Sequence, residues 1–411
     1  MKILLLHSYN IFQINNASSN RWRSIVEGLT KYGVNIEFII LSGYESPEEC
    51  RNFGVSGIIN NTLHYHYISS QRRFGYWRTR INMYLLNRFF CAINAYRVRK
   101  IVTSIKPDIV FLYPALDVFM TYSMSLSKRD SEFKLMIELN EFNDIWDTGA
   151  TNVIQRMNIK SYNHYLKNMV FPKLDICLVM TETLLTHFST FQGLKPGITF
   201  YKIPMTVDLS RFRVVDTKEK YRKPYIAYCG SGGFLSNGID ILLKSFSQIS
   251  KEYPELKLYI AAYWGKETEI MKSLINDLGL EGRAIYLGVL KRERIPDFLA
   301  GAELLTLPRP DSRQAQGGFP TKLGEYLASS KPVCVTDVGE IANYLKDNES
   351  AFFAEPGSID SFSHALRSAL CNKERANAVG INGRKVAEVH FNMESQMKRL
   401  YLFLKENLKC N

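Results

Sequence analysis

Strand-like and helix-like patterns alternate along almost the whole chain, and they do so in two consecutive series. The first series predicts a helix over residues 19–32 and strands at residues 2–7, 35–41, 108–113, 134–139, 175–180 and 199–203. The second series predicts strands at residues 225–229, 256–261, 284–287, 303–307, 332–336 and 351–354. Strands that alternate with helices form parallel sheets covered by helices on both faces. The pattern therefore predicts an α/β protein with two doubly wound sheets.

The length of the chain and one polar stretch divide these sheets between two domains. A chain of 411 residues is long for one core and sufficient for two domains of about 200 residues each. The best candidate for the linker is the polar, charged stretch of residues 216–223, which follows the end of the first series. We expect a Rossmann-like domain over residues 1–205, a linker over 206–223, a second Rossmann-like domain over 224–388 and a C-terminal helix over 389–411.

The composition excludes several classes of protein. No charge-free apolar run is long enough to span a bilayer, and Met1–His7 is too short for a signal peptide. The seven cysteines are odd in number and contain no closely spaced pair, which indicates reduced thiols and neither a disulfide framework nor a zinc site. The seven histidines show no metal-ligand spacing, and His64 and His66 are expected in a Tyr-rich surface loop. We therefore expect a cytoplasmic protein that needs no metal.

The net charge of +12 is concentrated in one basic and aromatic segment, residues 71–106, which contains no acidic residue. Three interpretations of this segment stay open. Cations and aromatic rings suit an anionic membrane surface. Single-stranded nucleic acid would also bind them, through stacking and phosphate contacts. A long helix would instead pack its aromatic stripe on the core and leave a solvated basic face. As a partner we expect the inner face of the cell membrane, with the protein peripheral to it, and no nucleic acid.

The segment Ala315–Ala328 carries the most specific motif of the chain. Gly317 and Gly318 let the backbone pass close to a ligand, and Pro320 fits a first helical position, so free amides and a helix N-terminus would face an anion. Glu325 lies one helical turn beyond Thr321, where its carboxylate would accept hydrogen bonds from two vicinal hydroxyls. The motif predicts a nucleotide-diphosphate site, and an ordinary Gly-Pro turn before an amphipathic helix remains the alternative.

This segment resembles the donor-binding signature of retaining glycosyltransferases of family 4. The residues that match are Gly318, Phe319, Glu325, Lys331, Pro332, Val333, Thr336, Asp337, Val338 and Gly339. Gly317 occupies the position of the first glutamate of the family's glutamate pair, which is expected to touch the donor sugar. Lys322 offers a point charge that would replace a missing basic contact.

The resemblance extends over the rest of the chain at the level of architecture. It implies the GT-B fold, in which two Rossmann-like domains face each other across a cleft that holds the substrate. Residues 203–212 resemble the family's interdomain signature, and residues 391–408 resemble the terminal helix that crosses back to the first domain. No cofactor is implied, because the nucleotide-diphosphate sugar is a substrate.

Residues 229–240 follow an expected strand and precede an expected helix, as a phosphate-binding loop does. In the resembling family this loop supplies two basic residues that grip the diphosphate. Ser231 and Asn237 stand at those positions here. We expect the replacements to be the amides of Ser231, Gly232 and Gly233, the Ser231 hydroxyl, and the side chains of Lys322 and Lys266.

The resemblance also assigns the base pocket. Backbone groups of Val289 and Leu290 would read the edge of the nucleotide base, unless these residues only form a strand and helix in register.

The first domain is expected to supply the acceptor side. Asn15 and Asn16 occupy the place of a Gly-Gly loop that approaches the donor diphosphate in the resembling family. Glu138, Asn140 and Glu141 lie at the end of an expected strand, where one carboxylate would stabilise charge at the sugar or take the acceptor proton. A solvated strand end is the alternative. Asn140 and Glu141 are the preferred catalytic candidates, together with Lys322.

The expected function is the transfer of a sugar, with retention, from a nucleotide-diphosphate sugar to a hydroxyl of a saccharide or lipid-linked saccharide in surface polysaccharide or glycan biosynthesis. Two alternatives stay open. One is a nucleotide-sugar epimerase or hydrolase of the same fold, and the other is a non-catalytic protein that binds sugar nucleotides or membranes.

Overall fold

The structure, a computed structural model, describes residues 1–13, 17–41, 56–60, 62–68, 87–113, 132–142, 156–157, 160, 164, 166–191, 193–212, 224–230, 233–262, 265 and 267–409, with the backbone alone for 87–92 and 169. The chain forms two compact units. The first comprises Met1–Ile14, Ile25–Ile203 and Met397–Asn411, and the second comprises Asn15–Ser24 and Pro204–Gln396.

The first unit contains an eight-stranded sheet with the order β3-β4-β2-β1-β5-β6-β7-β8. Its strands are β1 (Lys2–His7), β2 (Asn35–Ile40), β3 (Ser56–Ile59), β4 (Leu63–Tyr67), β5 (Ile109–Leu112), β6 (Lys134–Leu139), β7 (Ile176–Val179) and β8 (Thr199–Lys202). Neighbouring strands are parallel except for the antiparallel pair β3–β4. Its helices are α4 (Asn87–Ile105) and α7 (Glu182–Ser189), with short turns at η2 (Leu166–Val170) and η3 (Phe171–Lys173). Two further helices belong to it in part, α1 (Ala17–Thr30) from Ile25 onward and α16 (Met393–Lys409) from Met397 onward.

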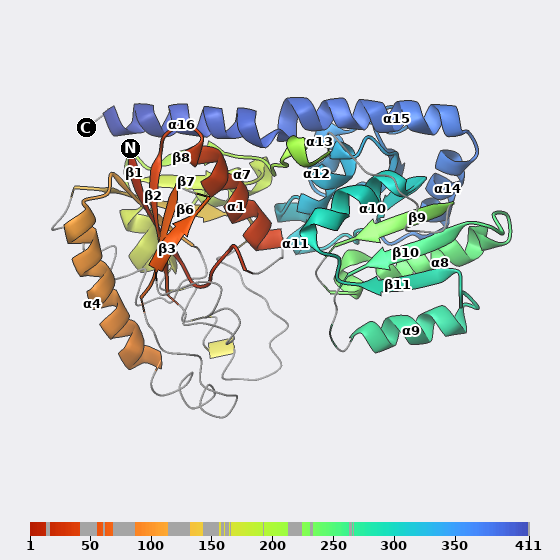
Figure 1. Cartoon of the computed structure of the whole chain (residues 1–411), viewed down its shortest axis with the longest axis horizontal. Coiled ribbons are helices and arrows are strands. Elements are labelled where there is room, and N and C mark those ends of the chain that lie inside the picture. Colours follow the sequence, from red (N-terminus) through yellow and green to blue (C-terminus); the bar gives the residue numbers. More distant parts are fainter. Residues whose placement is uncertain are drawn as a thin grey trace. The chain divides into compact units, whose positions relative to one another are not determined.

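The terminal helix α16 packs on elements of the first unit (Figure 1). The ring of Phe403 stacks on Tyr201 of β8 with centroids 4.3 Å apart. Lys134 of β6 donates from Nζ to the carbonyl oxygen of Asn407. Gly28 of α1 lies so close to the helix that a Cβ there would meet Met397 Cγ at 2.1 Å. These contacts explain why the end of the chain belongs to the unit in which the chain begins.

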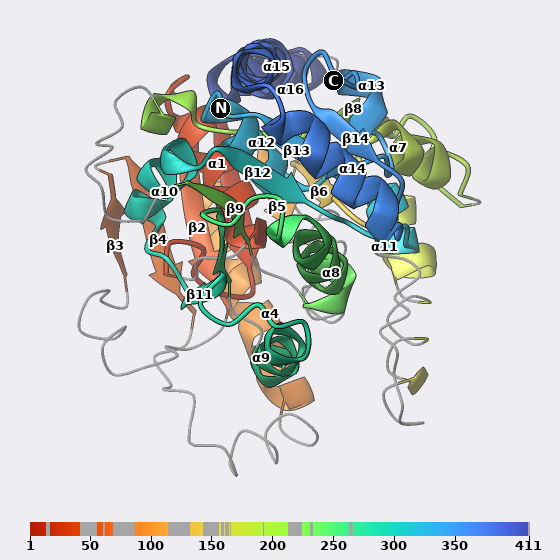
Figure 2. The ribbon, with the colours of Figure 1, turned by 90° about the vertical axis from the view of Figure 1, so that its right-hand side faces the viewer.

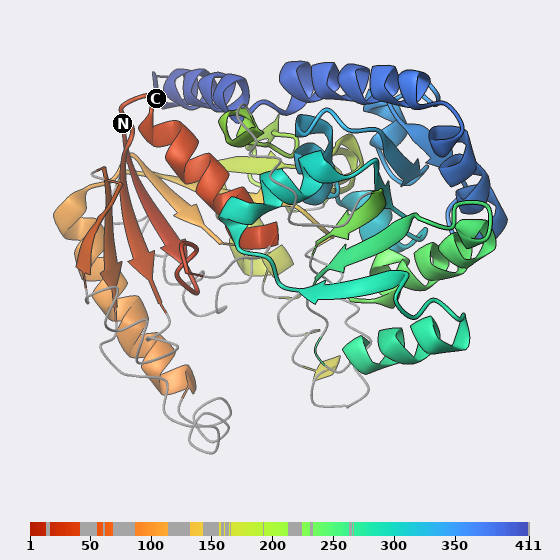
Figure 3. The same ribbon diagram turned by 45° about the vertical axis from the view of Figure 1, so that its right-hand side comes forward.

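The second unit contains a six-stranded parallel sheet with the order β11-β10-β9-β12-β13-β14. Its strands are β9 (Tyr225–Cys229), β10 (Lys257–Ala261), β11 (Ala284–Gly288), β12 (Leu304–Leu307), β13 (Val333–Thr336) and β14 (Phe352–Ala354). Figure 3 shows β9, β10 and β11 running in the same direction. The chain builds outward from β9 on one side and then on the other, so the carboxyl edge beside β9 is a topological switch point, where open α/β sheets bind ligands.

Helices cover both faces of this sheet and place its apolar residues in one core. They are α8 (Ile239–Ser250), α9 (Glu267–Asp277), α10 (Ile295–Gly301), α11 (Arg313–Gly317), α12 (Thr321–Ala328), α13 (Ile341–Tyr344), α14 (Ile359–Leu370) and α15 (Lys373–Val386), with short turns at η4 (Leu209–Phe212), η5 (Leu235–Asn237), η6 (Arg292–Arg294) and η7 (Ala387–Phe391). All five residues of β9 are buried. Such fully apolar strands are expected where a parallel sheet is covered on both faces.

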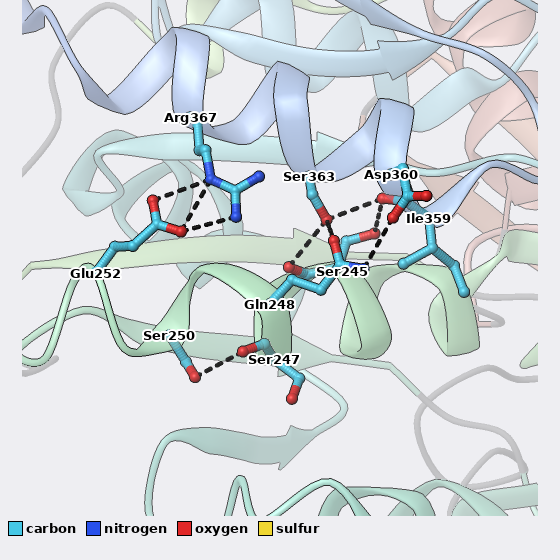
Figure 4. Close-up of polar contacts among 9 residues, drawn as sticks. All are labelled: Ser245, Ser247, Gln248, Ser250, Glu252, Ile359, Asp360, Ser363 and Arg367. Carbon is cyan, nitrogen blue, oxygen red and sulfur yellow. Dashed lines mark hydrogen bonds and ion pairs between the residues drawn. The ribbon is translucent and has the colours of Figure 1, made fainter.

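A row of polar contacts joins α8 to α14, which lie side by side (Figures 2 and 4). Ser363 donates to Gln248 Oε1 at 2.6 Å, and Gln248 donates to Asp360 Oδ1 at 2.9 Å. At the far end of the row, Arg367 forms a two-pronged ion pair with Glu252. The small serine side chains allow the two helices to approach, and their hydroxyls are satisfied within the interface.

The strands expected from the sequence are confirmed in both units to within one residue at each end, and the α/β architecture with two parallel sheets is confirmed. The loop expected around His64 and His66 is wrong. These residues lie on the exposed face of β4, where Leu63, Tyr65 and Tyr67 are buried. The alternation of buried and exposed residues is that of a strand with one solvated face. In the described part of the chain, no helix combines the length and apolar character needed to cross a bilayer.

Candidate functional site

Helix α12 is fixed to the carboxyl end of β9 by one phenol. The hydroxyl of Tyr326 accepts a hydrogen bond from the backbone N–H of Cys229 at 2.7 Å and donates to the carbonyl oxygen of the same residue at 2.9 Å. Pairing between β9 and β12 ends at Ala227, two residues earlier. The phenol therefore serves backbone groups beyond the end of that ladder, and it places the first turn of α12 beside the loop that leaves β9.

Lys322 lies at this junction and points at the loop. Its Nζ donates to Asn237 Oδ1 at 2.5 Å and to the hydroxyl of Tyr228 at 2.7 Å. Gly230 makes room for it, because a Cβ there would lie 2.8 Å from Lys322 Nζ. Burial, and next the charge of Arg309, lower the pKa of Lys322 to about 7. The ammonium thus lies beside Asn237, one of the two positions where the resemblance expects a basic residue.

The loop after β9 is only partly described, since Ser231, Gly232 and Lys266 lie outside the described residues. The carbonyl oxygen of Gly233 accepts from the backbone and side-chain nitrogens of Asn237 at 3.2 and 2.8 Å. The N–H of Phe234 donates to Glu267 Oε2 at 2.9 Å, so α9 holds the loop through a carboxylate. Gly238 ends η5 with φ of +70°, and a Cβ there would lie 1.8 Å from the Pro308 carbonyl oxygen. No other residue fits at Gly238 without a backbone shift.

The structure at Gly317 and Gly318 differs from the phosphate-binding turn that the sequence predicts. Gly317 ends the short helix α11, and the N–H of Gly318 donates to the Gln314 carbonyl oxygen at 3.0 Å, so this amide is not free for a ligand. Pro320 is the N-cap of α12 rather than its first helical residue. Phe319 is buried against the rings of Tyr344 and Phe391. Phe319 therefore anchors the turn in the core.

Glu325 and Thr321 are both partly exposed on α12, as the one-turn spacing predicts. The carboxylate of Glu325 has a partner that the sequence analysis did not identify. Arg211 Nη1 donates to Glu325 Oε1 at 2.6 Å. Among the described residues, the second oxygen, Oε2, accepts no hydrogen bond.

Val289 and Leu290 follow β11, at the same carboxyl edge of the sheet as Lys322. Gly288 has a φ of +69°, which turns the chain out of the strand, and the side chain of Val289 is 64% exposed. The segment therefore lies at the edge of the sheet where the base pocket is expected, and its role stays a prediction.

In the first unit, the three candidates at the end of β6 differ in burial. Glu138 is 1% exposed and pairs with Leu178 in the β6–β7 register, whereas Asn140 and Glu141 are partly exposed beyond the strand. Burial, with a smaller contribution from Glu138, raises the pKa of the Cys177 thiol. Asn140 and Glu141 are thus the more accessible of the three. Asn15 and Asn16 lie outside the described residues.

A polar and aromatic cluster at the end of β1 was not predicted. The buried ring of His7 lies against Tyr113 with centroids 3.9 Å apart, and burial lowers its pKa to about 3. Asn10 donates from Nδ2 to the hydroxyl of Tyr67 at 2.9 Å. The available signal was the run of polar residues after the first apolar strand, at the carboxyl edge of the sheet.

Tyr228 and Tyr326 of the second unit were also missed, because each acts through a contact with a residue distant in sequence. Arg309, whose charge lowers the pKa of Lys322, was missed as well. Within the described residues there is no group of three or more His, Cys, Asp or Glu side chains arranged to hold a metal ion.

Comparisons with known proteins bear on both units. Residues 215–386 match the family model of Glycosyl transferases group 1. Over 238 residues the chain is 23% identical to a GDP-mannose-dependent alpha-(1-6)-phosphatidylinositol monomannoside mannosyltransferase of Mycolicibacterium smegmatis, which covers 55% of this chain and 61% of the relative. The match thus spans less than two thirds of that relative's length.

Solved structures extend the likeness to the whole chain. Sucrose-phosphate synthase from Thermosynechococcus elongatus is similar with a TM-score of 0.77 and 14% identity, over 100% of both chains. HepE from Anabaena, solved in complex with UDP and glucose, gives a TM-score of 0.71 and 13% identity, over 99% of this chain and 100% of that one. At these identities the likeness shows a common fold. The chain therefore has the GT-B fold, and its residues 215–386 are similar to the glycosyl transferases group 1.

Proposed function

We propose that the protein is a retaining glycosyltransferase that moves a sugar from a nucleotide-diphosphate sugar to a hydroxyl of a saccharide or lipid-linked saccharide, in surface polysaccharide or glycan biosynthesis. Members of glycosyltransferase family 4, which residues 215–386 resemble, act with retention. The observation that carries the proposal is the position of Lys322, whose ammonium lies 2.5 Å from Asn237 Oδ1 beside the loop after β9. A cation at that point would meet the diphosphate of a donor.

The donor would lie along the carboxyl edge of the second sheet. Lys322 and the loop residues Ser231, Gly232 and Gly233 would hold the diphosphate, with Lys266 as a further cation. Glu325 would accept hydrogen bonds from the ribose, and the backbone of Val289 and Leu290 would contact the base. Gly317, Gly318, Phe319 and Thr321 would shape the wall next to the sugar. The mannosyltransferase relative is named for GDP-mannose, and HepE was solved with UDP, which supports a nucleotide-diphosphate donor.

Transfer would follow a front-face course, because no nucleophilic side chain is proposed at the reacting carbon. The bond between the anomeric carbon and the diphosphate oxygen breaks while the acceptor oxygen bonds to the carbon from the same face. The acceptor proton passes to the leaving phosphate oxygen. Lys322 stabilises the negative charge that develops on the leaving group. Glu141 or Asn140 would orient the acceptor hydroxyl, with Glu138, Asn15 and Asn16 as further acceptor-side residues.

A lipid-linked acceptor at the inner face of the cell membrane is supported by the described end of the basic segment. In α4, Tyr96 is 59% exposed, and Lys100 lies over its ring at 4.8 Å. These residues and Arg99 line a surface hollow of about 460 Å³. A ring flanked by cations is suited to the headgroup region of an anionic membrane. Residues 71–86 lie outside the described residues. The relative's name includes a phosphatidylinositol acceptor, which favours the same kind of acceptor here.

A thermal-shift screen of the purified protein against UDP, GDP, ADP, dTDP and CMP tests the donor site. A nucleotide that binds only the folded state raises the melting temperature by mass action. We expect one base to be selective, and we expect Lys322→Ala to abolish its shift. Lys272→Ala is the matched control, because Lys272 is an exposed lysine on α9 whose one ion pair with a described residue is to Glu269.

Turnover assays with the sugar nucleotide of the selected base then separate the alternatives. Consumption of donor without an acceptor would indicate an epimerase or hydrolase. Binding with no turnover under any condition would indicate a non-catalytic sugar-nucleotide-binding protein, which the glycine at position 317 favours. A wild-type protein that no nucleotide stabilises would refute the donor site.

A further inference from the structure

The guanidinium of Arg211 joins two parts of the second unit that are far apart in sequence. Nη1 donates to Oε1 of Glu325 on α12 at 2.6 Å, and Nη2 donates to the carbonyl oxygen of Arg292 in η6 at 2.9 Å. The side chains of Arg211 and Glu325 are 17% and 20% exposed. One planar side chain therefore holds a carboxylate and a backbone segment at once, which a lysine ammonium does with less geometric control.

The backbone segment that carries Arg211 is itself held in place. Leu209 and Phe212, the ends of η4, are buried. The carboxylate of Asp208 accepts from the backbone N–H of Ser210 at 3.0 Å and from its hydroxyl at 2.6 Å. The guanidinium also lies over the ring of Phe212, 5.6 Å from its centroid. Little freedom remains for the guanidinium to follow Glu325 if the carboxylate moves.

The chain before η4 is packed directly on the helix that carries Glu325. A Cβ at Gly324 would lie 2.5 Å from Met205 Sδ and 3.3 Å from Val207 Cβ. Val207 is in turn held by a hydrogen bond from its N–H to the Phe391 carbonyl oxygen at 2.8 Å. Arg211 thus approaches Glu325 from a segment whose distance to α12 is set by close packing.

The two groups that Arg211 joins are the two expected to meet the nucleoside. Glu325 is the carboxylate for the ribose hydroxyls, and Arg292 follows two residues after Leu290, whose backbone is expected at the base. Arg211 fills one acceptor position of Oε1, whereas Oε2 of Glu325 accepts no hydrogen bond from a described residue, so Oε2 is the more open oxygen for the ribose. A partly buried ion pair also adds little net stability, since desolvation offsets the attraction. The arrangement is better explained by geometry than by stability.

We propose that Arg211 is a positioning residue for the nucleoside half of the donor site. It orients Glu325 so that Oε2 faces the ribose diol, and it holds residues 289–292 at the distance that the base requires. This inference rests on the proposed function, because it assumes that a nucleotide binds at this edge. Arg211 itself is not expected to touch the diphosphate or the reacting carbon.

The test measures dissociation constants by calorimetry for UDP and GDP, for their 2′,3′-dideoxy analogues and for inorganic pyrophosphate. The wild-type protein should bind the ribonucleotide of its preferred base about tenfold more tightly than the dideoxy analogue, as expected for hydrogen bonds to a charged acceptor. In Arg211→Gln this preference should disappear and nucleotide affinity should fall by about tenfold, while pyrophosphate affinity stays within about twofold. Arg294→Gln, an exposed arginine of the same region, is the matched control and should behave as wild type.

Arg211→Lys keeps the positive charge but loses the planar guanidinium that bonds to two groups at once. Compared with Arg211→Gln it should therefore recover part of the nucleotide affinity, while the preference for the ribonucleotide stays reduced. It also serves as the test if Arg211→Gln does not fold. A variant of Arg211 that keeps the full ribose preference would overturn the inference while leaving the donor site intact. A wild-type protein that binds none of the nucleotides would refute the proposed function and the inference with it. Equal loss of pyrophosphate and nucleotide affinity would assign Arg211 to general structural support and would also overturn the proposal.

Discussion

Replacing Tyr326 by phenylalanine tests how α12 is held at the end of β9. The substitution removes one oxygen atom and leaves the ring in place. That oxygen satisfies both backbone groups of Cys229, at 2.7 Å for the N–H and 2.9 Å for the carbonyl. Tyr326 is 1% exposed, so water has little access to either group after the change. Two buried polar groups are left without the partner that they have now.

The expected loss follows from these two groups. A buried donor or acceptor without a partner costs about 1 to 3 kcal/mol, so the loss of the partner of two such groups should destabilise the second unit by about 2 to 6 kcal/mol. For a unit of this size, each kcal/mol corresponds to about 2 to 4 °C in the melting temperature. We therefore expect a decrease of roughly 4 to 24 °C in the melting temperature.

Differential scanning calorimetry is the appropriate assay, because it can separate the transitions of the two units. The control is Tyr253→Phe, whose hydroxyl makes no hydrogen bond to a described residue and whose loss should change stability by less than about 0.5 kcal/mol. A decrease of less than about 2 °C for Tyr326→Phe would be far smaller than two unsatisfied buried groups require. In that case the phenol would not be what joins α12 to β9. Nucleotide affinity should fall in parallel, because Lys322 is carried on the same helix.

Two further properties can be predicted from named groups. Burial lowers the pKa of Lys322 to about 7, and the charged form binds the diphosphate, so affinity should be highest below pH 7 and decrease by up to about tenfold per pH unit above it. Measuring the affinity for UDP or GDP between pH 6 and 9 tests this pH dependence, and Lys322→Arg should remove it. A wild-type affinity that does not change with pH would contradict the role of Lys322. The double variant Arg99→Gln, Lys100→Gln should bind anionic liposomes about 30-fold more weakly in a sedimentation assay, from about 1 kcal/mol per basic residue. The double variant should keep its nucleotide affinity, and unchanged liposome binding would argue against α4 as a membrane contact.

The strands of both sheets could be predicted from the sequence because their signal is local. Runs such as Tyr225–Cys229 and Val333–Thr336 are apolar throughout, and a strand buried on both faces needs nothing else. The strand β4 was missed because its tyrosines and histidines alternate, and the alternation was interpreted as a polar loop. Strands with one solvated face carry a weaker signal than strands that are buried on both faces.

The site was predictable only where one short segment contains it. The spacing from Thr321 to Glu325 fixes both on one helical face, and the structure agrees. The pairing of Arg211 with Glu325 spans 114 positions, and that of Lys322 with Asn237 spans 85. No periodicity connects residues so far apart, because their approach depends on how the strands are ordered in the sheet. The hydrogen bond from the Gly318 N–H to the Gln314 carbonyl oxygen was not predicted for a different reason, since the sequence did not indicate the short helix α11.

The order of strands in the second unit divides the proposed donor contacts between two half-sheets. Val289 and Leu290 follow β11, on one side of β9, whereas Lys322 and Glu325 lie on the helix between β12 and β13, on the other. Changes confined to the first side could therefore alter which nucleobase is accepted during evolution, without loss of the diphosphate contact. Arg211 is the exception, because it bonds to both sides. A lineage that changes its donor base would have to preserve this arginine or rebuild both of its contacts together.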